Sequence, residues 1–213
     1  MLPDVQAGEL TTCERDRDIR IFVSLPGLYS LANRRNARGE RRTFACRAVN
    51  ISESSIALIA PVTGELGQRV IADIDRLGKI EGAITHILSR GFVMSIVKSE
   101  GDHAQLADRI EWIEKHKNHD APDQRAHARF APKNPYSRLL LADGTLMTCL
   151  IIDLSETGAG ISADVEPKVG TVLAVGAIVG RVVRRFVGGF ALKFAEPQSR
   201  DSVETMATVN DQK

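Results

Sequence analysis

The chain has 213 residues, of which 43% are hydrophobic and 26% are charged, and its formal net charge is +1 at pH 7. This length allows one large domain or two small ones, and a nearly neutral chain has no overall attraction for nucleic acid or an anionic membrane. Aromatic residues make up only 5% of the chain, so we expect a core built mainly from Val, Ile, Leu and Ala.

The N-terminal residues, MLPDVQAGELTTCERDRD, are polar and acidic, and we expect residues 1–18 to be disordered. They lack the basic and apolar regions of a secretory signal. No apolar run approaches the roughly 20 residues that cross a bilayer. Cys13, Cys46 and Cys149 show no C-x-x-C spacing, so we expect no metal site and buried free thiols at Cys46 and Cys149. These features predict a cytoplasmic protein without a membrane span.

The sequence contains an internal repeat of low similarity. The segment CRAVNISESSIALIAPVTGELG from Cys46 aligns with CLIIDLSETGAGISADVEPKVG from Cys149. Glycines that recur in register indicate the same turns at the same places. The matched pairs are Cys46 with Cys149, Asn50 with Asp153, Ser52 with Ser155, Glu53 with Glu156, Gly67 with Gly170, Gly78 with Gly176, Gly82 with Gly180, and Gly91-Phe92 with Gly189-Phe190.

Each copy of the repeat has the pattern of short β-strands. TFACRAVNI and TLMTCLIIDL are rich in β-branched and apolar residues and end in polar turns. Further apolar runs follow at intervals of about 8–12 residues, which is typical of a small barrel or sandwich. Asp143-Gly144 predicts a hairpin turn between LLLA and TLMTCL. The sequence therefore predicts an all-β chain of two tandem small antiparallel β-barrels.

A helix is expected between the two copies. Leu106, Ile110 and Ile113 recur at helical spacing, with Trp112 beside them, so the helix should cap the first barrel. The segment NHDAPDQ then has the composition of a linker. The predicted units are the first barrel with its connecting helix (19–118), the linker (119–124), the second barrel (125–197), and a polar C-terminal tail (198–213) that is either frayed or a short helix.

Two short motifs stand in and just before the second copy. Arg125 and Arg129 form an R-x-x-x-R pair after the linker, and Asp153, Ser155 and Gly158 form D-x-S-x-x-G after an apolar strand. The first motif alone is commonly a solvated face. The second alone is a common turn, because Asp and Ser bond their own backbone. Their joint occurrence, in this order on a strand-rich repeat, is more specific than either motif.

Together the motifs resemble those of the PilZ domain family. The resemblance covers about residues 125–195, and residues 19–98 resemble the same fold with altered motifs. It implies that the second copy binds cyclic di-GMP. It also implies a bacterial protein acting in motility, exopolysaccharide formation or surface attachment.

The residue types suit a guanine dinucleotide. An arginine fork matches the O6 and N7 acceptors of guanine with two parallel hydrogen bonds, and a carboxylate can accept from base amino groups. The resemblance implies that Arg125 and Arg129 grip guanine and phosphate, that Asp153 and Ser155 hold the other face, and that Gly158 keeps the turn open. Without ligand, we expect the two arginines to have no buried partner.

The first copy departs from the family pattern. Asn50 replaces the aspartate, which the family tolerates, but Ser55 stands where the family has glycine, and the upstream Arg15, Arg17 and Arg20 have the wrong spacing. We therefore expect the first barrel to bind no cyclic di-GMP. It would serve instead as a scaffold, a dimerisation surface or a contact for output.

A basic run from Arg34 to Arg42 should lie at a hairpin tip. Such a run is most often a solvated loop, but it could contact nucleic acid, an acidic lipid surface or a partner protein. The absence of aromatic stacking platforms beside it disfavours a nucleic-acid-binding barrel, so we expect no nucleic acid partner.

No catalytic arrangement is evident, because the sequence lacks G-x-S-x-G, a P-loop, H-E-x-x-H and a Cys/His nucleophile pair. We therefore expect no enzyme and no cofactor. The leading hypothesis is a cyclic di-GMP receptor that relays binding, by reorienting its linker and domains, to an unidentified protein partner. The alternative is a PilZ-like protein-interaction module that binds no nucleotide. Either hypothesis is compatible with a homodimer.

Overall fold

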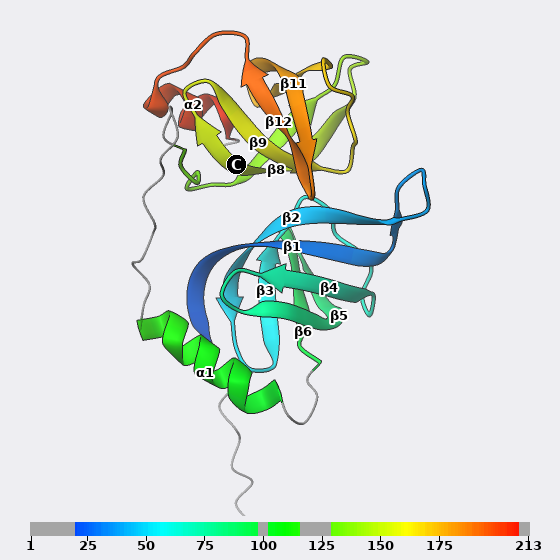
Figure 1. Cartoon of the computed structure of the whole chain (residues 1–213), viewed down its shortest axis with the longest axis vertical. Coiled ribbons are helices and arrows are strands. Elements are labelled where there is room, and N and C mark those ends of the chain that lie inside the picture. The colour runs from blue at the N-terminus through cyan, green and yellow to red at the C-terminus, as the bar shows by residue number, and fades with distance from the viewer. Residues whose placement is uncertain (1–19, 98–101, 116–128, 209–213) are drawn as a thin grey trace, which may run out of the picture.

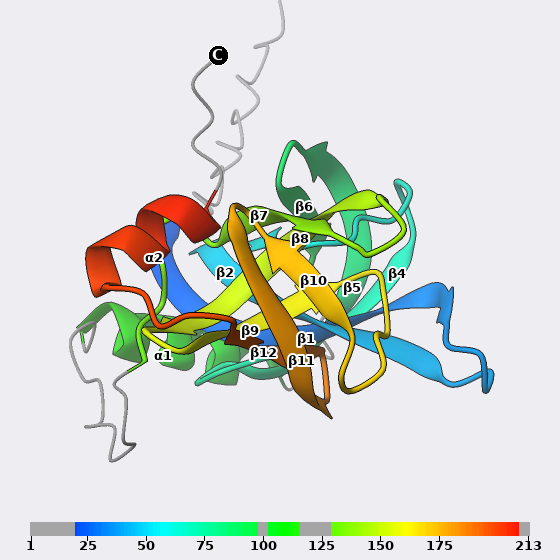
Figure 2. The same ribbon diagram turned by 90° about the horizontal axis from the view of Figure 1, so that it is seen from above.

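The computed structural model describes residues 20–97, 102–115 and 129–208. These residues form two closed antiparallel barrels of six strands each and two short helices, α1 and α2. The barrels are stacked along the long axis of the molecule (Figure 1), and Figure 2 shows them from above. The predicted all-β fold of two tandem small barrels is confirmed.

The two barrels have the same topology, as the repeat predicts. The strand order in the first is β1-β2-β3-β6-β5-β4, and β7-β8-β9-β12-β11-β10 is its counterpart in the second. The first barrel and its helix comprise β1 (Ile21–Arg35), β2 (Arg41–Ile51), β3 (Ser55–Ile59), β4 (Arg69–Ile74), β5 (Gly78–Leu88), β6 (Gly91–Ser95) and α1 (Asp102–Lys115). The second comprises β7 (Tyr136–Leu140), β8 (Leu146–Ser155), β9 (Gly158–Ala163), β10 (Val172–Val175), β11 (Ile178–Phe186), β12 (Gly189–Phe194) and α2 (Arg200–Ala207).

Equivalent glycines make equivalent close approaches in the two barrels. A Cβ on Gly91 would lie 1.9 Å from the carbonyl oxygen of Leu58, and one on Gly189 would lie 2.2 Å from that of Ile161. Gly91 opens β6 and Gly189 opens β12, so each glycine lets a strand begin directly against its neighbour. The recurring glycines therefore do mark repeated backbone geometry.

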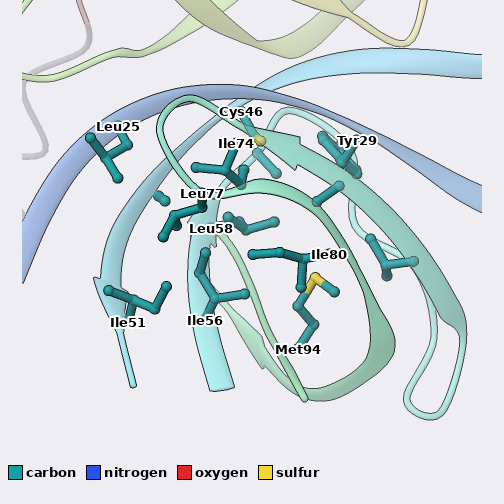
Figure 3. Close-up of a cluster of buried hydrophobic side chains, with 14 of the residues drawn as sticks. Leu25, Tyr29, Cys46, Ile51, Ile56, Leu58, Ile74, Leu77, Ile80 and Met94 are labelled. Atoms are coloured by element: carbon teal, nitrogen blue, oxygen red, sulfur yellow. The ribbon is translucent and has the colours of Figure 1, made fainter. Parts of the chain in front are cut away.

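Alternating side chains fill the first barrel (Figure 3). In β3, Ile56 and Leu58 point into the core, while the residues on either side of them are only partly buried. The ring centroids of Tyr29 and Phe92 are 5.4 Å apart, and the two rings meet edge-on. Cys46 is a buried free thiol in this core, and burial raises its pKa.

The helix α1 closes one end of the first barrel. Ile110 and Ile113 are buried in its core, and the Arg109 guanidinium donates to the carbonyl oxygen of Leu77 at 2.6 Å. The predicted cap is therefore present, although the side chain of Leu106 lies outside the described residues. Among the described helices, none is long and apolar enough to cross a membrane.

The C-terminal residues form a helix that packs on the second barrel. Ser199 caps α2 by accepting from the amide of Ser202, and Val203 and Ala207 are buried in the barrel core. Of the two alternatives for the predicted tail, the structure therefore contains the short helix. It extends the second unit beyond residue 197.

The two barrels are joined by an ionic contact. Arg42, at the start of β2, pairs with the carboxylate of Asp164 in the second barrel, and the Arg42 side chain is only 15% exposed. Its Nε lies 3.5 Å from Glu166 Oε1. The basic run does form the β1–β2 hairpin, but it is not a solvated tip at Arg42, because the second barrel supplies two carboxylates.

Backbone contacts extend this interface. The amide of Ala45 lies 3.0 Å from Ser162 Oγ and 3.3 Å from the carbonyl oxygen of Gly188, in the β11–β12 turn. A Cβ on Gly188 would approach Leu28 Cδ2 to 2.6 Å. The turn between β11 and β12 therefore packs directly against the first barrel.

Candidate functional site

An isolated bridge fixes the segment that carries the second arginine of the R-x-x-x-R pair. The amide of Phe130 donates to the carbonyl oxygen of Leu154, and the amide of Leu154 donates back, both at 2.9 Å. Leu154 lies near the end of β8, between Asp153 and Ser155. The bridge therefore places Arg129 beside the D-x-S-x-x-G motif.

Arg129 and Asp153 form a preorganised ion pair. Nη1 of Arg129 lies 3.2 Å from Oδ1 and 3.1 Å from Oδ2 of Asp153. The two side chains are 30% and 28% exposed, so the pair is partly shielded from water yet reachable from solvent. We expected the arginines to have no buried partner without ligand; Arg129 has a partner that is only partly buried. The pair uses one guanidinium nitrogen, and a guanidinium has five N–H donors.

A glycine that the motif does not include positions the carboxylate. The amide of Gly160, opposite Asp153 on β9, donates to Asp153 Oδ1 at 3.2 Å. A Cβ on Gly160 would lie only 3.0 Å from that oxygen. Asp153 therefore lies directly over the backbone of β9. In the sequence, the signal for this contact was Gly160 itself, the second glycine of β9, two residues after Gly158.

Ser155 and Gly158 shape the turn between β8 and β9. The hydroxyl of Ser155 donates to the carbonyl oxygen of Gly158 at 3.2 Å and is buried. A Cβ on Gly158 would lie 2.3 Å from the carbonyl oxygen of Leu192 on β12. Close packing of β9 against β12 therefore requires glycine at this position.

Of the five residues predicted for the site, Arg129, Asp153, Ser155 and Gly158 come together at this corner. Arg125 lies outside the described residues. Within the parts of the chain that the structure describes, no group of His, Cys, Asp and Glu side chains could hold a metal ion.

Two further arginines that sequence reasoning missed lie close to the same segment. The guanidinium of Arg200, at the start of α2, lies over the ring of Phe130 at 4.5 Å from its centroid. Arg47 of the first barrel donates to the carbonyl oxygen of Pro132 at 3.1 Å. Arg47 is half-buried, and desolvation lowers its pKa. It also lines an interbarrel cavity of about 480 Å³ with Leu150 and other residues of both barrels.

The first barrel keeps part of this geometry. Ile21 pairs with Ile51 as Phe130 pairs with Leu154, so Arg20 stands in the position of Arg129. Four residues before Arg20 the sequence has Asp16. This is the position at which the R-x-x-x-R pair of the second copy has Arg125.

The remaining positions of the equivalent site in the first barrel show how it differs from the site in the second barrel. The hydroxyl of Ser52 donates to the carbonyl oxygen of Ser55 at 3.3 Å, which repeats the turn of the second barrel. Asn50, however, lacks the negative charge of an aspartate, and it pairs with Ala57 rather than with a glycine. The first site therefore retains the turn but neither the carboxylate nor the close backbone contact beneath it.

Comparisons with known proteins give the following matches. A family model described as the PilZ domain matches residues 123–208. Curated protein sequences give no significant match. The Borreliella burgdorferi PlzA protein in complex with c-di-GMP is 12% identical, with a TM-score of 0.31, covering 90% of this chain and 93% of that chain. The Bacillus subtilis inhibitor of motility MotI/DgrA is 10% identical (TM-score 0.28; 88% and 94% covered), and Escherichia coli YcgR in complex with c-di-GMP is 13% identical (TM-score 0.27; 86% and 80% covered).

Proposed function

We propose that the second barrel, within residues 123–208 that match the PilZ domain model, binds cyclic di-GMP at the corner of Arg129, Asp153 and Ser155. Arg125, from the preceding segment, completes the grip on the ligand. The protein acts as a receptor without catalytic activity of its own.

The observation that carries this proposal is the ion pair of Arg129 and Asp153 over Gly160. Asp153 offers carboxylate oxygens that can accept from the N1–H and amino group of guanine. The remaining donors of Arg129 can bind the O6 and N7 edge of a guanine, or a phosphate oxygen. Since both side chains are already held in place, little ordering of this part of the site opposes binding.

We also propose that binding is relayed through the two docked barrels to a protein partner. The segment that begins with Arg129 reaches Pro132, whose carbonyl oxygen is held by Arg47 of the first barrel. A ligand that engages Arg125 and Arg129 would favour one position of this segment over others. It would thereby shift the arrangement of the barrels, as differential contacts allow. Control of motility, exopolysaccharide or biofilm is the output implied by the family.

A second candidate function is a protein-interaction module that binds no nucleotide. The ion pair favours it in one respect, because Arg129 has a carboxylate partner without any ligand. In that case the pair is a structural contact that holds the segment before β7 onto the barrel.

Calorimetric titration of the full chain with cyclic di-GMP distinguishes the two. The receptor predicts saturable binding that Arg129→Ala weakens by about ten- to a hundredfold, the loss expected for a charge-assisted contact of about 1.5–3 kcal/mol. Arg69→Ala removes an exposed Arg–Glu pair of the first barrel and should leave binding unchanged. No heat of binding with the folded wild-type chain would leave the interaction module as the function.

Amide hydrogen exchange tests the relay separately from binding. Amides of residues 118–130 should exchange more slowly when cyclic di-GMP is added, together with those from Asp153 to Gly158. Slower exchange confined to the β8–β9 turn would leave the receptor intact and remove the relay through this segment.

A further inference from the structure

The outer face of the second barrel carries a row of apolar side chains across four strands. Leu146 pairs with Leu140, Leu140 with Ala174, and Ala174 with Val179, so that these residues are neighbours from β8 through β7 and β10 to β11. Figure 2 shows β7, β10 and β11 side by side. The exposed fractions are 55% for Leu146, 42% for Leu140 and 50% for Val179. Val172, on the same face of β10 as Ala174, is also exposed and adds to the row.

The first barrel does not share this chemistry. Its equivalent positions, found from the same strand pairings, are Thr43, Ser30, Ile71 and Glu81. A barrel of this kind therefore does not require apolar residues on its outer face. Contiguous exposed apolar surface on a soluble protein marks an interaction site more often than chance.

The row is continuous with a surface that another barrel already covers. Along the outer face of β8, Leu150 is only 2% exposed and lines the interbarrel cavity. Thr148, two residues before it, donates to the carbonyl oxygen of Pro61 in the first barrel at 3.4 Å. Leu146 lies two residues before Thr148, on the same outer face of β8. Barrel-to-barrel contact thus ends where the uncovered row begins.

The equivalent face of the first barrel also contacts a barrel. Ser30, Thr43 and Ile71 line a small cavity together with Val187, from the β11–β12 turn of the second barrel. In this chain, the same face of the repeated fold therefore packs against another copy of that fold.

We propose that the row on the second barrel is covered by the second barrel of another copy of this chain, in a two-fold symmetric dimer. A two-fold axis between Leu140 and Ala174 places the large Leu140 of each copy on the small Ala174 of the other. It also places Leu146 of each copy on Val179 of the other. A surface of this kind is self-complementary, as a two-fold contact requires.

The charges around the row set the salt dependence of the dimer. Arg138 lies on β7 two residues before Leu140, beside the proposed two-fold axis. The Arg138 side chains of the two copies therefore approach one another when the copies meet. Salt screens this repulsion and leaves the apolar contact in place, so the dimer strengthens as the NaCl concentration rises.

Sedimentation equilibrium of the full chain over a range of concentrations and NaCl levels tests the proposal. The wild type should associate to a dimer, more tightly at high salt. Leu140→Glu and Val179→Glu should each weaken the dimer by at least about tenfold, because each puts a charge into the apolar contact. Ile87→Glu changes a residue of the first barrel that is 53% exposed, and it should leave the dimer intact.

A cross-linking experiment tests the geometry independently of these variants. In a Cys13→Ser background, chains with only Leu140→Cys mixed with chains with only Ala174→Cys should form an intermolecular disulfide under mild oxidation, whereas chains with only Ile87→Cys should not; the two cysteines are kept on separate chains because Leu140 and Ala174 are neighbours within one barrel. A wild type that stays monomeric at every concentration and salt level would overturn the proposal. So would a dimer that neither glutamate variant weakens, because the row would then face a different partner.

Discussion

Arg42 of the first barrel and Asp164 of the second are 122 residues apart in the chain and form an ion pair in the fold. The pair lies next to the amide of Ala45, which points to Ser162 and Gly188 of the second barrel. The two barrels are thus docked by contacts between side chains and backbone groups, in addition to their covalent connection.

Loss of this ion pair should loosen the docking. In Arg42→Ala, the Asp164 and Glu166 carboxylates lose their shared partner, and a charge-assisted contact of this kind contributes about 1.5–3 kcal/mol. We expect the Ala45 amide to exchange with solvent about tenfold faster or more, as measured by NMR. Arg41→Ala, which removes a neighbouring exposed arginine, should have no such effect. Equal exchange in the two variants would show that the backbone contacts alone hold the barrels together.

Gly188 offers a test of close approach between the barrels. Gly188 and Gly144 have nearly the same φ, +87° and +85°, but a Cβ on Gly144 meets nothing within 4 Å. Valine at either position carries the strain of a positive φ. Only Gly188→Val also forces Leu28 and Ala45 away, and overpacking of this kind costs about 1–3 kcal/mol. Urea unfolding should therefore show a larger loss of stability for Gly188→Val than for Gly144→Val. Equal losses would mean that the interface adapts freely.

Asp153 and Asn50 form a matched pair of positions for the nucleotide site. In Asp153→Ala, Arg129 loses its partner and guanine loses its acceptor, so the affinity for cyclic di-GMP should fall by at least about tenfold. Asn50→Ala makes the equivalent change in the first barrel and should leave the affinity as it is in the wild type. Calorimetry of the two full-length variants checks this. A loss of binding in Asn50→Ala would show that the first barrel takes part in binding the ligand.

The buried thiols predict a fall in stability at alkaline pH. Burial raises the pKa of Cys149 to about 12 and raises that of Cys46 as well, whereas an unfolded thiol titrates near 8.5. Above about pH 8.5 the unfolded chain releases these protons and the folded chain keeps them. Unfolding is therefore favoured progressively as the pH rises from about 8.5 toward the folded values.

Chemical denaturation between pH 7 and 10 measures this dependence. The variant with both Cys46→Ala and Cys149→Ala starts from a lower stability, because each change leaves a small cavity. Its stability should nevertheless decline less steeply with pH than that of the wild type. Identical slopes would mean that other groups account for the whole alkaline loss.

Much of the fold follows from the sequence because it depends on short-range patterns. The short runs of apolar and β-branched residues between turn residues predict the strands, and the hairpin at Asp143-Gly144 follows from turn chemistry alone. The repeat from Cys46 and Cys149 predicts two copies of one barrel, since matched turn residues impose matched backbone paths. The pairing of R-x-x-x-R with D-x-S-x-x-G likewise locates the candidate site.

Contacts between distant residues were decided only by the tertiary structure. Strand register shows that Arg20 stands in the place of Arg129, although its spacing from other arginines differs from the motif. Gly160 supports Asp153 only because β9 lies directly opposite β8. The partner of Arg42 and the apolar row from Leu146 to Val179 depend on which strands become neighbours, and on which faces a second barrel covers. A linear sequence records each side chain, but closing the barrels and docking them determines which side chains meet.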